Sequence, residues 1–249
     1  MHILAIETTG PYCSVALINE KGEIAEDTSD QLLSHLQSLT VMISSMLDSH
    51  DLSLGDLDAI AVSEGPGSFT GIRIGISTAR GISQVLGTRL IPVPTLRAFG
   101  SYEYSLLPEE RRGTLVCHVI DARRDQVYAS GCTGDDEAVP GGAYMLDEFL
   151  GLLEDRRDIR FVGDGVKKYG ARIRSWAEET GKNVETEAVV QHAAGVARLG
   201  LRLYSEGVSC DYESLKPNYM RKAQAERKLE ARKAAEKAAG RGGAEAGNG

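Results

Sequence analysis

A glycine-rich turn is the part of this sequence that comes closest to a site for chemistry. Residues 64–75 read Glu-Gly-Pro-Gly-Ser-Phe-Thr-Gly-Ile-Arg-Ile-Gly, after an apolar run at 59–62 that predicts a buried strand and before a helical pattern. Such a turn can hold a phosphate, because backbone N–H groups point out of it and the helix dipole favours an anion. However, no Gly-Lys-Ser/Thr follows, and the glycine spacing is one residue too long for a dinucleotide fingerprint.

The same glycines have a second use, as a smooth face of a helix. Small residues recur at every fourth position, at Gly67, Gly71, Gly75 and Ala79. Residues four apart lie on one face of a helix, and a face without large side chains lets another backbone come close. Such a face either receives a partner helix or packs on this protein's own sheet, and the spacing favours neither use.

Histidines and cysteines form no motif for a metal or for hydrolysis. The five histidines include no pair at helical ligand spacing and no His-Glu-x-x-His. The four cysteines are scattered, which is typical of buried or idle thiols in a reducing cytoplasm. The nearest approach to Gly-x-Ser-x-Gly, at 75–79, falls inside a predicted helix. We therefore expect no metal site, and a peptidase would need one.

The overall composition is that of a globular chain in water. Of the 249 residues, 42% are hydrophobic and 26% are charged. No apolar run approaches the ~20 residues that span a bilayer, and no basic segment with an apolar core opens the chain. We expect a cytoplasmic protein with no membrane association and no signal peptide. The net charge of −8 argues against broad electrostatic binding of nucleic acid by the body of the protein.

The charge is unevenly distributed along the chain. Residues 221–249 contain eight Lys or Arg and four Glu, a net charge of +4, which leaves −12 on residues 1–220. Ala, Lys, Glu and Arg dominate this tail and favour a helix, but Leu229 is its only large apolar residue. We expect a charged tail that is helical or disordered. It is either a solubilising extension or a segment that contacts RNA or an acidic partner.

Apolar patterns predict the elements that position the glycine-rich turn. Strands are expected at 3–6, 13–18 and 23–27, so the chain opens as a meander. Large apolar residues then recur at intervals of four and three, which predicts an amphipathic helix that ends near residue 50. The members of this leucine stripe are Leu32, Leu36, Leu39, Ile43 and Met46.

The second half of the chain repeats this order of elements. A strand at 115–120 leads to Asp121, as the first strand leads to Glu7, and in each case a short polar turn and another strand follow. This echo predicts two related α/β lobes. Their limits are expected at 1–105 for the N-terminal lobe, 106–220 for the C-terminal lobe and 221–249 for the tail, because the polar segment before residue 113 contains a proline.

Five blocks of this sequence carry a resemblance to a known family. They lie at 3–9, 13–17, 65–75, 121–128 and 217–221. Together, and in this order, they resemble the bacterial TsaB family from residue 1 to about 221. The resemblance implies an α/β fold of the actin/Hsp70/sugar-kinase type, built from two RNase-H-like lobes.

The resemblance also implies a function in tRNA modification. TsaB proteins help to make threonylcarbamoyladenosine in tRNA as non-catalytic partners of the related enzyme TsaD, with the ATPase TsaE joining the assembly. On this basis the chain is not an enzyme and meets tRNA indirectly, through the complex. The alternative is a nucleotide-dependent small-molecule kinase or ATPase of the same superfold, which would need a competent ATP site.

Comparison with TsaD-type enzymes indicates where chemistry has been lost. Thr95 and Phe99 stand where those enzymes carry the two histidines of a metal-binding motif, and neither residue replaces a histidine ligand. The resemblance therefore implies no cofactor for this chain, with ATP and a metal on the partner proteins. Glu7, Asp121 and Asp164 are expected to be remnants of a nucleotide cleft, because lysine and metal motifs are missing.

The family pairs through the first two helices of the N-terminal lobe, which implies a partner surface here. That surface would consist of the leucine stripe, the small-residue face and two neighbouring isoleucines. Its members are Leu32, Leu36, Leu39, Ile43, Met46, Gly67, Gly71, Ile72, Gly75, Ile76 and Ala79. A leucine at Gly71 would then block TsaD without unfolding the chain, and the same surface would permit a self-dimer. The alternative is that the stripe is core that faces the sheet.

Overall fold

The N-terminal part of the chain forms a five-stranded mixed sheet. The computed structural model describes residues 1–220, so the predicted tail lies outside the described residues. The strands are β1 (His2–Glu7), β2 (Ser14–Asn19), β3 (Ile24–Thr28), β4 (Ala59–Gly65) and β5 (Arg89–Pro94). Their spatial order is β3-β2-β1-β4-β5, with β1 antiparallel to β2 and parallel to β4.

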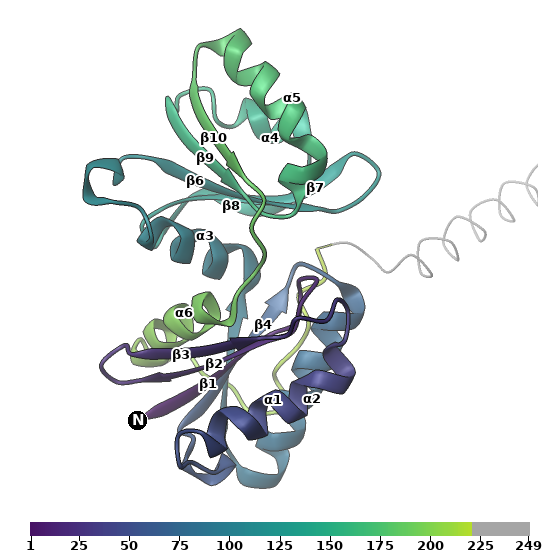
Figure 1. Ribbon diagram of the computed structural model, residues 1–249, viewed down its shortest axis with the longest axis vertical. Coiled ribbons are helices and arrows are strands. Elements are labelled where there is room, and N and C mark those ends of the chain that lie inside the picture. The colour runs from purple at the N-terminus through teal and green to yellow at the C-terminus, as the bar shows by residue number, and fades with distance from the viewer. Residues whose placement is uncertain (221–249) are drawn as a thin grey trace, which may run out of the picture. The chain divides into compact units, whose positions relative to one another are not determined.

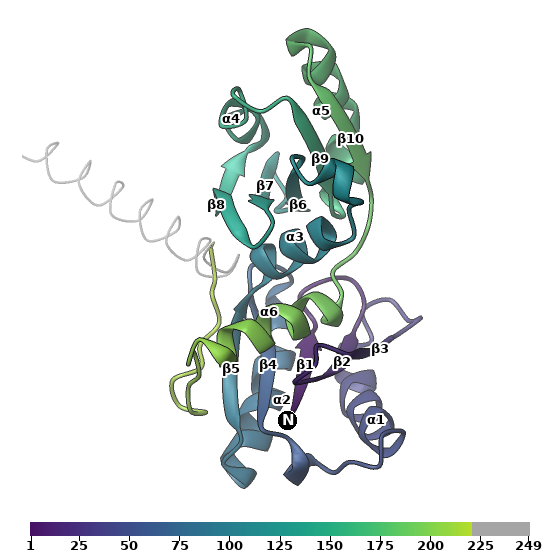
Figure 2. The ribbon, with the colours of Figure 1, turned by 90° about the vertical axis from the view of Figure 1, so that its left-hand side faces the viewer.

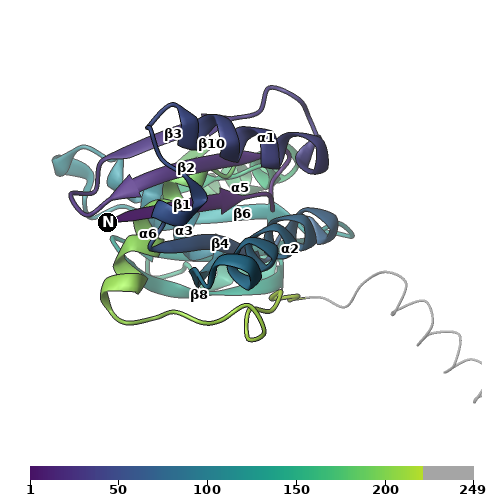
Figure 3. The same cartoon turned by 90° about the horizontal axis from the view of Figure 1, so that it is seen from below.

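Helices cover both faces of this first sheet, which explains why its central strands are apolar almost throughout. Helices α1 (His35–Asp48) and α2 (Phe69–Leu86) lie next to each other on one face (Figures 1 and 3). Helix α6 (Ala193–Ser205) crosses the other face (Figure 2). Neighbouring residues of β1 point to opposite faces. Leu4 therefore joins the core beneath α1 and α2, and Ile3 joins the core beneath α6.

A second five-stranded sheet repeats the arrangement of the first. Its strands are β6 (Leu115–Asp121), β7 (Gln126–Thr133), β8 (Asp136–Met145), β9 (Asp158–Val162) and β10 (Asn183–Glu187). Their order is β8-β7-β6-β9-β10, which matches the first sheet strand for strand. Helices α4 (Leu146–Gly151) and α5 (Gly165–Thr180) pack on this sheet. The predicted α/β fold with two related lobes is confirmed.

The chain passes between the two sheets twice. Helix α3 (Thr95–Ser105) follows β5, and it contacts α6 as well as β6 and β7 of the second sheet. The chain then returns from β10 to α6, which packs on β1 and β2. The expected limits of 106–220 for the C-terminal lobe include α6, whereas the contacts of this helix are with the first sheet.

After α6 the chain continues along the edge of the first sheet as far as the glycine-rich turn. Leu90 and Cys210 exchange backbone hydrogen bonds of 2.8 and 3.0 Å. The N–H of Asn218 donates to the carbonyl oxygen of Glu64 at 2.7 Å, immediately before the turn. Among the helices of residues 1–220, none has the length and apolar character needed to cross a membrane.

Candidate functional site

The small-residue face of α2 is covered by the chain's own backbone. A Cβ atom at Gly71 would collide with the carbonyl oxygen of Thr8, and one at Gly75 would lie 2.5 Å from the Thr8 hydroxyl oxygen. That hydroxyl donates to the Gly71 carbonyl at 2.8 Å. Gly67 lies close to Thr9, which belongs to the same loop as Thr8. Ala79 is fully buried. The prediction that this face receives a partner is wrong, because the loop between β1 and β2 already occupies it.

Most of the leucine stripe is also core. Leu39, Ile43 and Met46 pack with strand residues beneath α1, and Ile72 and Ile76 join the same cluster from α2. As partner contacts these five residues were wrongly predicted, because the interior of the first lobe uses them. A leucine at Gly71 would therefore disturb the fold itself.

Two residues of the predicted partner surface do reach solvent. Leu32 is 63% exposed and Leu36 is 77% exposed, and Leu32 precedes the first turn of α1. As partner contacts these two residues remain a prediction. Leu36 lies at the start of an exposed surface that the structure defines.

The outer faces of α1 and α2 form this exposed surface, which we call the outer α1–α2 face. The members on α1 are four residues apart, so they lie in one line along that helix. The members on α2 are spaced i, i+3, i+4 and i+7, so they share one face of that helix. Its members are Leu36, Thr40, Ser44, Ile74, Ser77, Thr78 and Gly81. Gly81 has no atom within 4 Å of the position of an added Cβ, so the fold does not require a glycine there.

The sequence contained a signal for this surface that the prediction missed. Small residues at 77, 78 and 81 form a second small-residue stripe on α2, about half a turn from the first. A glycine in a helix interior costs about 1 kcal/mol relative to alanine. Gly81 has no packing contact that would offset this cost, whereas Gly71 and Gly75 pack against Thr8.

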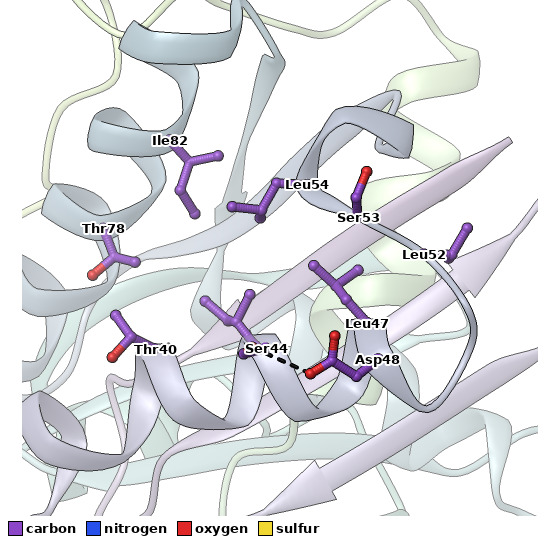
Figure 4. A pocket seen from close by; sticks show the side chains of 10 residues that line it. Thr40, Ser44, Leu47, Asp48, Leu52, Ser53, Leu54, Thr78 and Ile82 are labelled. Carbon is purple, nitrogen blue, oxygen red and sulfur yellow. Dashed lines mark hydrogen bonds between the residues drawn. The ribbon is translucent and has the colours of Figure 1, made fainter.

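A pocket of about 300 Å³ opens on the outer α1–α2 face (Figure 4). Its wall is apolar and its rim carries hydroxyl groups and one carboxylate. The labelled side chains come from α1, from α2 and from the segment after α1 that contains the short 3-10 helix Leu54–Asp56. Ser44 donates to Asp48 at 3.4 Å on the rim. Among residues 1–220, no histidine, cysteine or lysine lines this pocket, so it offers a place for an apolar group.

The glycine-rich turn uses its polar groups internally. The N–H of Gly65 donates to Thr95 at 3.2 Å, and the N–H of Ser68 donates to the Thr9 carbonyl at 2.8 Å. The side chain of Ser68 caps α2 by accepting from the N–H of Gly71 at 3.2 Å. These donors would have to leave their partners before a phosphate could bind, so the turn is a structural connection.

Glu7 is enclosed at the end of β1, with 1% of its surface exposed. Its carboxylate accepts from the N–H and hydroxyl groups of Thr9, at 2.5 and 2.6 Å, and from the hydroxyl of Ser63. Burial raises the pKa of Glu7, and these hydrogen bonds act against that rise. No oxygen of this side chain points to solvent, so Glu7 offers nothing to a soluble nucleotide.

Asp121 and Asp164 come together at the ends of β6 and β9. Asp164 accepts from the N–H of Asp121 at 3.2 Å, and the Asp121 carboxylate accepts from Lys168 at 3.3 Å and from Tyr169 at 3.1 Å. Burial raises the pKa of Asp164. The adjacent Gly163 has φ of +118°, and a Cβ there would collide with the β6 backbone. Close packing therefore explains this turn, and Asp121 and Asp164 form no metal-binding cluster with Glu7 among residues 1–220.

The position of the missing metal motif is filled by an aromatic contact. The ring of Phe99 lies 3.9 Å from the ring of His118, measured between centroids. His118 is completely buried, and burial lowers its pKa to about 3. A backbone interaction with Leu96 acts against that lowering, and residues 1–220 hold no cluster of His, Cys, Asp and Glu that fits a metal ion. The donor groups at this position do not suit a metal.

Comparisons with known proteins give the chain a family context. A family model described as TsaD, tRNA N6-adenosine threonylcarbamoyltransferase, matches residues 29–229. The tRNA threonylcarbamoyladenosine biosynthesis protein TsaB of Bacillus subtilis is 30% identical over 92% of this chain and 97% of that protein. The protein of the same name from Escherichia coli is 29% identical over 92% and 98%. The crystal structure of YeaZ from Pseudomonas aeruginosa superposes with a TM-score of 0.71 at 27% identity, covering 88% of this chain and all of that one.

The two kinds of glycine on α2 make a paired prediction. Gly71→Ala is expected to destabilise the fold by about 1–3 kcal/mol, because the new methyl group overlaps the Thr8 backbone. Gly81→Ala is expected to stabilise it by up to about 1 kcal/mol through helix propensity. Urea denaturation of both variants measures the difference, and equal stability of the two would contradict the assignment of the faces.

The neutral state of His118 predicts a dependence of stability on pH. The unfolded chain takes up a proton on this histidine near its ordinary pKa of 6.5, whereas the folded chain does so only near 3. The contribution of His118 to the free energy of unfolding is therefore complete above pH 6.5. It falls by about 1.4 kcal/mol for each pH unit as the pH drops through this window.

His118→Met removes this titration. Urea denaturation between pH 7 and 4.5 is expected to give a shallower loss of stability for this variant than for the wild type. His50→Met, at an exposed histidine, is the control and is expected to follow the wild type. A parallel loss in all three chains would contradict a neutral, buried His118.

Proposed function

This chain belongs to the TsaB family of tRNA threonylcarbamoyladenosine biosynthesis proteins, and we propose that it acts there as a non-catalytic subunit that binds a TsaD-type enzyme. The observation that carries the proposal is the outer α1–α2 face with its pocket. Binding of tRNA then occurs through the complex, and a TsaE-type ATPase joins it. ATP and the metal belong to the partner proteins, and this chain carries no cofactor of its own.

Large apolar side chains that α1 and α2 expose to solvent support a protein partner. Val41 and Val85 are 65% and 81% exposed, in addition to Leu36. Contiguous apolar surface on a monomer marks an interaction site, whereas isolated exposed residues need no explanation. The pocket between the helices gives the surface a concave centre into which a large apolar side chain of a partner fits.

Simple energetics indicate what the partner must provide. Burying one large side chain in the pocket contributes roughly 1.5–3 kcal/mol. Association costs on the order of 4–15 kcal/mol, so one anchor is not sufficient. A partner must cover both helices, with a total buried area of at least about 1,000 Å². A related protein with two similar helices meets that need, and a second copy of this chain can do so when the enzyme is absent.

The internal hydrogen bonds of the candidate site residues in the described part of the chain support the non-catalytic part of the proposal. The glycine-rich turn, Glu7 and the Asp121–Asp164 pair each have internal partners for their polar groups. The kinase or ATPase alternative needs phosphate contacts from these same groups. A kinase or ATPase function therefore requires these groups to leave their internal partners, whereas binding to a partner protein does not.

Gly81→Arg tests the proposed surface directly. The arginine side chain has room in the free chain, so the fold stays intact, but it projects from the α2 part of the outer α1–α2 face. Affinity for the TsaD-type enzyme is expected to fall at least tenfold, or about 1.4 kcal/mol, in isothermal titration. Gly81→Ala is the matched control and is expected to bind like the wild type.

The same variants are then assayed in tRNA threonylcarbamoylation with the TsaD-type and TsaE-type proteins. Gly81→Arg is expected to lower product formation in proportion to the lost binding, and an excess of the variant is expected to restore it in part. Unchanged binding by Gly81→Arg would refute the surface. Threonylcarbamoylation or ATP turnover by the isolated wild-type chain would refute the non-catalytic role.

A further inference from the structure

The loop between β1 and β2 is wrapped around a single buried carboxylate. Glu7 Oε1 accepts from the N–H of Thr9 at 2.5 Å and from its hydroxyl at 2.6 Å. Glu7 Oε2 accepts from the hydroxyl of Ser63, which reaches across from the parallel strand β4. The N–H of Gly10 also interacts with this carboxylate. Two successive backbone N–H groups and two hydroxyl groups thus converge on one side chain.

This set of donors is the kind that binds an oxyanion. Successive N–H groups in a turn form a concave nest with a partial positive charge, and hydrogen bonds to a charged acceptor are the strong ones. No lysine or arginine in the described part of the chain forms an ion pair with Glu7. Burial raises the pKa of Glu7, and the dipoles of these donors, with no ion pair among the described residues, act against that rise.

The surroundings hold the loop closed over the carboxylate. His35 contacts the carbonyl oxygen of Gly10 through its Nε2 at 3.0 Å. Gln191, from the segment that returns to the first sheet, packs against Gly10 from another side. Gln191 is 97% buried, and neither atom of its side-chain amide has a hydrogen-bond partner. An uncommitted donor therefore lies beside the loop, in addition to those that Glu7 uses.

We propose that the β1–β2 loop is an oxyanion-binding nest that this chain keeps filled with its own Glu7 carboxylate. The internal carboxylate fixes the loop that supports α2, and it excludes phosphate, free or on a nucleotide, from this position. The first lobe therefore has the hydrogen-bond donors of an anion site, but Glu7 takes the place of an external anion. This inference does not depend on which partner covers the outer α1–α2 face.

Glu7→Gly tests the nest by emptying it. Formate has the size and charge of the missing carboxylate, so it is the probe. The thermal unfolding midpoint of Glu7→Gly is expected to be below that of the wild type in sodium chloride. It is expected to rise with formate concentration at constant ionic strength, as for a ligand that binds only the folded state. Glu64→Gly, at a half-buried glutamate outside the nest, is the control and is expected to melt equally in both salts.

If Glu7→Gly does not fold in chloride, a refolding experiment tests the proposal. Dilution of Glu7→Gly from urea into formate is then expected to recover the native circular dichroism spectrum, whereas dilution into chloride is not. The proposal is overturned if formate and chloride act alike on Glu7→Gly in both assays. It is also overturned if the wild type binds inorganic phosphate as tightly as Glu7→Gly does in isothermal titration.

Discussion

The approach of helix α2 to the backbone of Thr8 is the contact on which the rest of the structure depends. Only glycine at 71 allows the helix to lie against that carbonyl group, and Gly75 extends the contact by one turn. The contact fixes the loop after β1, and this loop in turn encloses Glu7. It also decides which side of α2 is interior. The opposite side, with Ser77 and Gly81, is left for solvent or for a partner.

Much of the fold was predictable from the sequence, because burial leaves a periodic pattern. The apolar runs located β1, β4 and β6, and the match between the Glu7 and Asp121 segments predicted two related lobes, which the matching strand orders confirm. The leucine stripe predicted α1 within one turn of its end at Asp48. These features follow from alternation or helical spacing along one segment, and no distant contact is needed to infer them.

The partner surface was less predictable, because the same spacing serves two purposes. Small residues four apart permit close packing on any backbone, and the sequence does not say whose backbone it is. The leucine stripe had a similar ambiguity: Leu36 points outward and Leu39 inward, although both fit one pattern. The packing of α6 on the first sheet depends on a return of the chain from the second sheet, which no local pattern encodes.

In both lobes, the acidic residue at the end of the first strand has hydrogen-bond partners within the chain. The nest of the first lobe holds Glu7, and Asp121 of the second lobe binds Lys168 and Tyr169. In the place of a metal motif, Phe99 packs on a neutral histidine. The outer α1–α2 face, with Leu36, Ile74 and several hydroxyl groups, remains accessible in the described part of the chain.

Cysteine footprinting measures the central claim most directly, because it reports on one helix face at a time. Ser77→Cys and Ser175→Cys, each combined with Cys210→Ser, place a thiol on the outer side of α2 and on exposed α5 respectively. In the free chain both thiols are expected to react readily with iodoacetamide. On addition of the TsaD-type enzyme, Ser77→Cys is expected to become protected while Ser175→Cys does not. Undiminished labelling of Ser77→Cys in the complex would contradict the account.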